Sequence, residues 1–212
     1  MDFGNGARER RADVSETQTG LQIELGCGPN KRPGFVGIDN QEFPGVDIAL
    51  DVNVDKLPFP DDSVDYLYSS HAFEHFGNYP FILQEIFRVC RPMATVEIWT
   101  PYGKSNDGLL FGHLTFFTET HFKHICYEYD RFYLQESPGY FEWRASHYNL
   151  FPGIVEQLQC MGITLEFALD HMFNIALEWG TFLCVRKDAA RAPGPQIPER
   201  KYFYGRTQPA VC

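Results

Sequence analysis

The chain has 212 residues, a length that fits one domain of ordinary size. Hydrophobic residues make up 44% of it and charged residues 22%, so it can bury a core and is not of the disordered class. The sequence has 18 Lys and Arg against 28 Asp and Glu, a formal net charge of −10. Because basic side chains provide most of the affinity for phosphate backbones, we expect no nucleic acid as a partner. The same charge disfavours an anionic membrane surface.

The sequence also indicates the cellular compartment of the protein. It contains no run of 18 apolar residues, and the N-terminal segment lacks the apolar part of a secretory signal. Its six cysteines are scattered, with no C-x-x-C pair, a pattern typical of free thiols in a reducing compartment. We therefore expect a cytoplasmic protein without a membrane segment, either a monomer or a homodimer.

The two ends of the chain differ in composition from the part between them. Residues 1–20 are polar and without periodicity, which predicts a flexible N-terminal arm. Residues 187–212 are rich in proline, which predicts a C-terminal tail that ends the regular structure, although its aromatic residues 202–204 are able to dock on the body. The predicted domain is residues 21–186.

Within this domain, short apolar runs alternate with helical patterns. The runs stop at glycine or at polar residues, as buried parallel strands do. Strands are predicted at 21–25, 35–38, 46–50, 64–68 and 94–99. Helices are predicted at 79–90, around 118–127 and around 152–161, and a closing hairpin-like strand pair at 163–169 and 175–185. This alternation predicts an α/β fold with its site at the carboxyl ends of the strands.

Two connections depart from the regular pattern. Only residues 26–34, with Pro29 and Pro33, separate the first two strands, so the first crossover is shortened and has room for one helical turn at most. Residues 101–150 are too long and too aromatic for an ordinary connection, which predicts an inserted lid on the substrate side.

Polar and glycine residues follow the first three predicted strands. Gly26 and Gly28 allow a ligand to approach the backbone closely. Asp39 ends the second strand, where an acidic side chain can accept both hydroxyls of a ribose, and Asp51 follows the third, where an adenine edge would lie. Lys31 replaces the last glycine of a dinucleotide fingerprint, and the short crossover leaves no helix to anchor a pyrophosphate. The pattern favours an adenosine ligand without phosphates, such as S-adenosylmethionine.

Three segments together, 24–39 (ELGCGPNKRPGFVGID), 51–76 and 88–103, resemble the class I S-adenosylmethionine-dependent methyltransferases, in particular the methyltransferase type 11 group. The resemblance implies a Rossmann-like, mostly parallel seven-stranded sheet with an antiparallel last strand, and S-adenosylmethionine as cofactor. Asn30 departs from the usual third glycine of the loop. The cofactor-binding residues implied by the resemblance are Glu24, Gly26, Cys27, Gly28, Asp39, Asn40, Asp51, Val52 and Ser70.

The string His71-Ala-Phe-Glu74-His75 after the fourth strand reads H-x-x-E-H, a zinc-peptidase signature. On a helix, His71 and His75 would share a face and ligate zinc, with Glu74 activating water. The sequence offers no obvious third ligand on a later helix, and a similar string occurs in the resembling family for reasons unrelated to zinc. We therefore expect no metal ligands, and a zinc hydrolase remains an outside alternative.

His71 and His113 are the candidate catalytic residues, as a base or as groups that orient the acceptor. His113 precedes a predicted helix capped by Thr118, and related methyltransferases carry a similar segment beside the active cavity. The alternative is a histidine packed among aromatic neighbours. Aromatic residues later in the same connection either line an acceptor pocket or form a satellite core; they are Tyr140, Phe141, Trp143, His147 and Tyr148.

These observations lead to two functional hypotheses. The first is a methyltransferase that transfers the methyl group of S-adenosylmethionine by direct displacement to oxygen or nitrogen of a small polar molecule, such as a sugar or a secondary metabolite. The second is a protein that binds S-adenosylmethionine without turnover and acts as a partner or regulator.

Overall fold

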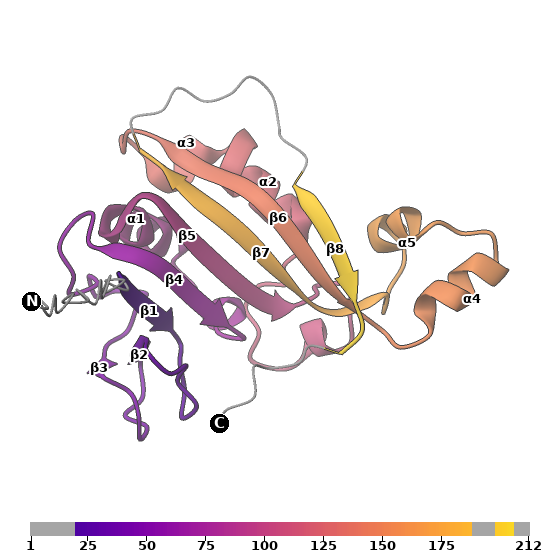
Figure 1. Cartoon of the computed structure of the whole chain (residues 1–212), viewed down its shortest axis with the longest axis horizontal. Coiled ribbons are helices and arrows are strands. Elements are labelled where there is room, and N and C mark those ends of the chain that lie inside the picture. Colours follow the sequence, from indigo (N-terminus) through magenta and orange to yellow (C-terminus); the bar gives the residue numbers. More distant parts are fainter. Residues whose placement is uncertain (1–19, 188–197, 206–212) are drawn as a thin grey trace, which may run out of the picture.

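The computed structural model describes residues 20–187 and 198–205 (Figure 1). These residues form one eight-stranded sheet in the order β3-β2-β1-β4-β5-β7-β6-β8. β7 is antiparallel to both neighbours, and every other pair of adjacent strands is parallel. The strands are β1 (Leu21–Leu25), β2 (Val36–Asp39), β3 (Ile48–Ala49), β4 (Val64–Ser70), β5 (Cys90–Pro101), β6 (Tyr140–Leu150), β7 (Ala176–Arg186) and β8 (Glu199–Phe203). The Rossmann-like, mostly parallel fold predicted from the sequence is confirmed, with one strand more than expected.

The helices are short apart from α1. They are the 3₁₀ turn η1 (Phe73–His75), α1 (Tyr79–Val89), the 3₁₀ turn η2 (Asp107–Leu109), α2 (Glu119–Lys123), the π turn η3 (His124–Glu128), α3 (Asp130–Leu134), α4 (Ile154–Cys160) and α5 (Leu165–His171). In Figure 1, α1, α2 and α3 lie behind the sheet, whereas α4 and α5 lie beyond the ends of β6 and β7. The main core is therefore between one face of the sheet and the first three helices.

The sequence pattern of α1 explains its place. Ile82, Leu83, Ile86 and Phe87 recur at helical spacing and are all buried. The helix passes directly into β5, the strand that pairs with β4. The resulting β4–α1–β5 unit places the end of β4, and the residues that follow it, at the same edge of the sheet as the ends of β1 and β2.

The shortened first crossover is confirmed. Residues 26–35 contain turns and no helix, and the backbone N–H of Gly26 donates to the carbonyl of Ile38 at 2.8 Å, so the loop folds straight back onto β2. With no helix above it, this end of the sheet is open to a ligand.

The prediction of a strand at 163–169 is wrong. These residues belong mostly to α5, whose first turn is capped by Thr164, the side chain of which accepts a hydrogen bond from the N–H of Phe167 at 3.2 Å. Periodicity alone does not distinguish a strand from a helix in a short apolar run, and the Thr164 cap favours the helix. The hairpin partner of β7 is β6 instead.

The prediction that residues 101–150 form one inserted lid is also wrong. Tyr140–Leu150 is β6, a strand inside the sheet, and Phe141, Trp143 and Tyr148 are buried in the core. The aromatic residues of this segment fill the core because β6 needs large side chains against α2 and η3, so the core alternative is confirmed for these three. Only residues 102–118 remain as a connection at the site edge of the sheet.

The predicted tail contributes a strand. Residues 199–203 pair in parallel with β6 as β8, so the expectation that regular structure ends at residue 187 is wrong. Tyr202 stacks on Tyr148 with ring centroids 5.5 Å apart, as the aromatic cluster of the tail suggested. The predicted N-terminal arm lies outside the described residues, apart from Gly20.

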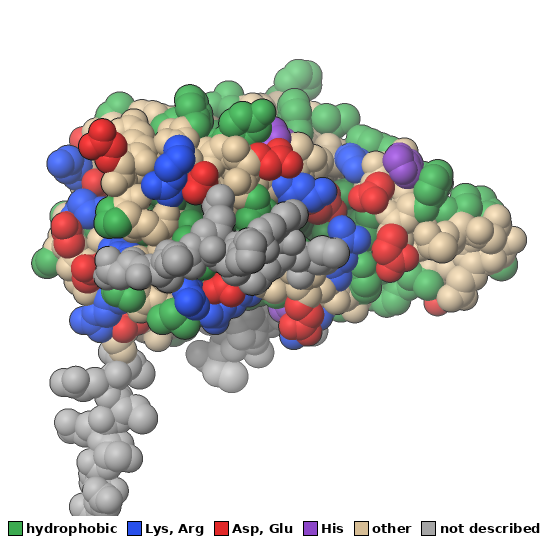
Figure 2. Space-filling model, turned by 90° about the horizontal axis from the view of Figure 1, so that it is seen from above, with side chains coloured by type: hydrophobic (Ala, Val, Ile, Leu, Met, Phe, Trp, Pro, Cys, Tyr) green, Lys and Arg blue, Asp and Glu red, His purple; other side chains and the backbone are tan. Residues whose placement is uncertain are grey.

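Basic and acidic side chains alternate on the face of the molecule seen in Figure 2, and neither sign forms a continuous patch there.

In residues 20–187 and 198–205, no helix is long and apolar enough to cross a bilayer. The cysteines of the described ranges, Cys27, Cys90, Cys126, Cys160 and Cys184, are all free thiols.

Candidate functional site

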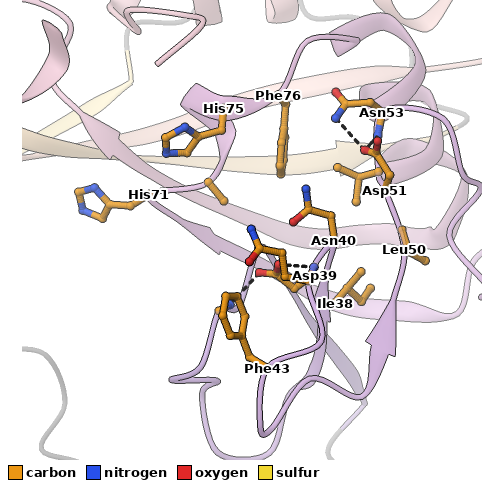
Figure 3. Close-up of a pocket in the computed structure, with 15 residues that line it drawn as sticks. Ile38, Asp39, Asn40, Phe43, Leu50, Asp51, Asn53, His71, His75 and Phe76 are labelled. Carbon is orange, nitrogen blue, oxygen red and sulfur yellow. Dashed lines mark hydrogen bonds between the residues drawn. The ribbon is translucent and has the colours of Figure 1, made fainter. Parts of the chain in front are cut away.

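A cavity of about 480 Å³ opens at the carboxyl ends of β1, β2, β3 and β4 (Figure 3). Each of these strands contributes the residues that follow it, so the cavity is a direct product of the parallel topology. It is lined by Gly26, Gly28, Ile38, Asp39, Asn40, Gln41, Phe43, Leu50, Asp51, Val52, Asn53, His71, Ala72, His75 and Phe76.

The glycines of the first loop have two different roles. Both have positive φ, 66° at Gly26 and 54° at Gly28, a conformation that disfavours side chains. A Cβ on Gly26 would overlap the side chain of Ala72, so this glycine allows the loop to pack against the segment after β4. A Cβ on Gly28 would meet no heavy atom within 4 Å. The backbone at Gly28 therefore forms an open edge of the cavity, which fits the close approach of a bound cofactor.

Asp39 joins the end of β2 to this loop. Its Oδ2 accepts a hydrogen bond from the N–H of Gly28 at 2.9 Å, and its Oδ1 accepts one from the N–H of Gln41 at 3.0 Å. Asp39 and Asn40 both line the cavity. A carboxylate has further lone pairs for two vicinal hydroxyls, so this position fits a ribose.

The loop after β3 forms the next wall. Oδ1 of Asp51 accepts hydrogen bonds from the backbone N–H and the side-chain Nδ2 of Asn53, at 2.9 and 2.8 Å. Oδ1 of Asn53 in turn accepts from the N–H of Gly77 at 2.8 Å, which ties this loop to the segment after η1. Val52 and Phe76 add apolar surface to the same cavity. A polar edge beside apolar walls fits the adenine ring that the sequence predicted here.

Three predicted cofactor residues do not line this cavity: Glu24, Cys27 and Ser70. Glu24 is 5% exposed, its Oε2 accepts a hydrogen bond from the N–H of Arg32 at 2.6 Å, and burial raises the pKa of its carboxyl. It therefore holds the shape of the 26–35 loop. Burial raises the pKa of the Cys27 thiol to about 11, so this thiol is not a nucleophile at neutral pH.

A second cavity of about 420 Å³ adjoins the first, and the two share His71 and His75. Its other lining residues come from η1, the end of β5, the connection that follows β5, β6 and β7. They are Glu74, Pro101, Asp107, Leu110, His113, Asn149, Leu177 and Glu178. Both candidate catalytic histidines, His71 and His113, thus lie at this cavity.

His71 stands at the junction of the two cavities in a strained conformation. It has φ 52°, its N–H donates to the carbonyl of Trp99 at 2.9 Å, and its Nε2 lies 2.7 Å from Oε2 of Glu178. Since a carboxylate only accepts, Nε2 carries the proton and Nδ1 is left basic. A left-handed non-glycine residue costs about 1–2 kcal/mol, and such strain is concentrated at functional sites. Asn149 holds the other oxygen of Glu178 through its Nδ2 at 3.3 Å.

The H-x-x-E-H string does not have the zinc-peptidase geometry. Only Phe73–His75 are helical, in a 3₁₀ turn, and φ at His71 is not that of a helix. His71 and His75 therefore do not share a helical face. Glu74 is 2% exposed, and burial raises the pKa of its carboxyl.

His113 belongs both to the cavity and to an aromatic contact. Its ring lies edge-on to that of His75 with centroids 4.9 Å apart, and its Nδ1 lies 3.0 Å from the carbonyl oxygen of Gly108. The predicted cap beyond it is present, since α2 begins after Thr118, whose N–H donates to Nδ1 of His121 at 3.2 Å.

Several lining residues were not predicted. Four of them follow the same strand ends as the predicted residues: Phe43, Leu50, Asn53 and Phe76. Their positions in the loops next to the predicted motifs were the sequence signal that could have identified them. Glu178 is 107 residues from His71 and lies on β7, the antiparallel strand. No local pattern marks it, because it meets His71 only through the strand order of the sheet.

The sequence of residues 23–98 matches the family described as "Methyltransferase domain". This segment spans β1 to β5 and contains the residues that line the first cavity. No curated protein is significantly similar to this chain in sequence.

Two solved structures show the same fold. A SAM-dependent methyltransferase from Archaeoglobus fulgidus is 15% identical with a TM-score of 0.52, over 78% of this chain and 86% of that one. A SAM-dependent methyltransferase from Aquifex aeolicus is 13% identical with a TM-score of 0.50, over 78% of this chain and 82% of that one. The family match covers the strands that build the first cavity but less than half of the chain, and the two solved structures share the fold; together they support an S-adenosylmethionine-dependent methyltransferase, with S-adenosylmethionine as the cofactor.

Proposed function

We propose that this enzyme methylates an oxygen or a nitrogen of a small polar molecule, such as a sugar or a secondary metabolite. The observation that carries the proposal is the meeting of the two cavities at His71 and His75. The first cavity has the glycine edge, the ribose-binding carboxylate and the apolar wall for the cofactor. The second is the place from which an acceptor reaches the transferred methyl group.

The lining of the second cavity supports a polar acceptor. Asp107, Asn149 and Glu178 offer carboxylate and amide oxygens, and the three histidines offer ring nitrogens. Such groups hydrogen-bond hydroxyls and amines, whereas an apolar acceptor would make no polar contact with them. A cavity of about 420 Å³ is in the range of small-molecule sites.

The chain's own residues would align the acceptor and receive its proton. When bound, S-adenosylmethionine supplies a methyl group already activated on sulfur, which an acceptor atom takes as the carbon–sulfur bond breaks and sulfur keeps the bonding pair. Nδ1 of His71 would take the proton that the acceptor loses, and Glu178 would stabilise the resulting imidazolium through Nε2. Orientation at the junction is the larger contribution, since well-placed reactants gain about 7–11 kcal/mol.

The test is transfer of label from S-adenosylmethionine with a radioactive methyl group into a whole extract of cells, which contains both small molecules and macromolecules. We expect the label in compounds that pass a small-pore filter, and its loss with Asp39→Ala, which impairs the cofactor cavity. A surface variant, Glu136→Gln, serves as the control. Label only in macromolecules would contradict the small-molecule acceptor. Cofactor binding without any transfer would favour the non-catalytic alternative.

A further inference from the structure

Glu74, His75 and His113 bring three potential metal ligands together at the second cavity. One ligand atom from each lies within 4.8 Å of the other two. Glu74 and His75 come from η1 after β4, and His113 comes from the loop after η2. The N–H of Leu114 donates to the carbonyl of Glu74 at 2.7 Å, which fixes the loop of His113 against η1. A backbone hydrogen bond therefore holds the two segments of the cluster together.

Each of the two imidazole rings has its Nδ1 at a backbone carbonyl. Nδ1 of His75 lies 3.0 Å from the carbonyl of Gly112, and Nδ1 of His113 lies 3.0 Å from the carbonyl of Gly108. Since a carbonyl oxygen only accepts, each Nδ1 carries the proton and each Nε2 has a free electron pair. Metal-bound histidines commonly donate their second N–H to a backbone carbonyl in this way.

The third potential ligand is the carboxylate of Glu74. Glu74 is 2% exposed, and in the described ranges its Oε2 has no hydrogen-bond partner. Its Oε1 lies 3.7 Å from Nδ1 of His71. A buried carboxylate oxygen without a partner is costly, and a cation beside it offsets that cost. Thus Glu74, with its unpartnered oxygen, and the two imidazoles line one cavity.

We propose that Glu74, His75 and His113 bind a divalent transition-metal cation such as Zn²⁺. Two imidazoles and one carboxylate suit such a cation better than Mg²⁺, which prefers oxygen ligands. With three protein ligands, the cation keeps open positions toward the cavity. Its role rests on the proposed function: the open positions take a hydroxyl oxygen of the acceptor, lower the pKa of that hydroxyl and hold the oxygen for methylation. The acceptor class narrows accordingly to hydroxyl compounds.

Metal binding is tested on the full chain without an affinity tag, stripped with a chelator and titrated with Zn²⁺ by calorimetry. We expect one Zn²⁺ per chain and no comparable binding of Mg²⁺. His113→Asn and Glu74→Gln should each weaken Zn²⁺ binding at least about 100-fold, given that even residues supporting the ligands change metal affinity about 10–100-fold. His124→Asn is the matched control, since Nε2 of His124 lies 3.1 Å from Oε2 of Glu128 in a surface pair. This control variant should bind Zn²⁺ as tightly as the wild-type chain.

The proposal is overturned if the wild-type chain binds no Zn²⁺, if His113→Asn binds as tightly as wild type, or if His124→Asn loses as much affinity as His113→Asn. Because a variant can misfold, the wild-type chain is also titrated under NMR observation of its histidine rings. Zn²⁺ should shift the resonances of His75 and His113 and leave that of His124 in place; the reverse would contradict the site.

The role of the cation is tested separately from cofactor binding. Chelation should abolish methyl transfer and leave binding of S-adenosylhomocysteine unchanged, and Zn²⁺ should restore transfer. If the chain transfers methyl groups without binding Zn²⁺, the metal proposal fails and the proposed function stands. If it binds Zn²⁺ at these residues without transferring methyl groups to any hydroxyl compound, the site stands and its role fails.

Discussion

The Oδ2 atom of Asp39 accepts a hydrogen bond from the backbone N–H of Gly28 at 2.9 Å. This contact joins the end of β2 to the glycine loop after β1, a connection in which no helix is present. The side chain of Asp39 therefore holds the backbone edge of the first cavity in place.

Removal of this carboxylate should weaken cofactor binding. In Asp39→Ala we expect the affinity for S-adenosylhomocysteine to fall about 10–100-fold, because hydrogen bonds to a charged group contribute about 1.5–3 kcal/mol. Calorimetry measures the change. Glu42→Gln, an exposed residue of the same loop outside the cavity lining, is the control and should bind as wild type. Equal affinities in Asp39→Ala and wild type would show that Asp39 does not hold the ribose.

In Gly28→Ala we expect the chain to fold but to lose affinity for the cofactor. Gly28 and Gly34 both have positive φ and open space at the Cβ position, and only Gly28 lines the cavity. Each alanine substitution should cost about 1–2 kcal/mol of unfolding free energy from backbone strain, measured with urea. Gly28→Ala should in addition lose most of its affinity for S-adenosylhomocysteine, whereas Gly34→Ala should keep it. Similar affinity in the two variants would contradict the close approach of the cofactor at Gly28.

Glu178 should support turnover without affecting the cofactor. In Glu178→Gln we expect kcat to fall about 10²–10³-fold if His71 acts as the base, since general-base catalysis contributes about 10²–10⁴-fold. S-adenosylhomocysteine binding should remain unchanged, because Glu178 lines only the second cavity. Glu199→Gln on β8, an exposed glutamate, is the control. A kcat within a few-fold of wild type would remove His71 and Glu178 from proton transfer.

Glu85 should make stability dependent on pH. It is 7% exposed, and although burial opposes its ionisation, hydrogen bonds from Arg88 and from the N–H of Leu57 outweigh burial and lower its pKa. A lowered folded-state pKa stabilises the fold above the unfolded value of about 4.3, and this contribution is lost as the pH falls through the folded value.

Glu85→Gln should therefore lose about 1–3 kcal/mol of unfolding free energy at pH 7. The difference from wild type should narrow as the pH falls below about 4.3. Urea titrations across this range measure the difference, and Glu136→Gln, which is exposed, controls for charge alone. If the difference in unfolding free energy between wild type and Glu85→Gln grew toward acid pH, the pKa of Glu85 would not be lowered in the folded state.

The sequence correctly predicted the N-terminal half of the sheet, because local sequence patterns determine the structure there. Gly26, Gly28, Asp39 and Asp51 stand directly after apolar runs, and parallel strands bring their ends together whatever the packing elsewhere. The same reasoning located α1 from its apolar stripe. These features depend on neighbours in sequence, so a single sequence contains them.

Long-range pairing was not predictable in the same way. β6 lies beside β7 and β8 beside β6 in the sheet. From the sequence, the aromatic residues of β6 fitted either an acceptor pocket or a satellite core. Glu178 and His113 join His71 and His75 only through that topology. The metal proposal likewise depends on a ligand from a distant loop, which the H-x-x-E-H string alone did not supply.

The most direct measurement for the central claim is a calorimetric titration of the wild-type chain with S-adenosylhomocysteine. The geometry of the first cavity predicts saturable one-to-one binding in the micromolar range, with adenosine competing for the same site. An absence of heat at millimolar ligand, or binding that adenosine does not displace, would contradict the account.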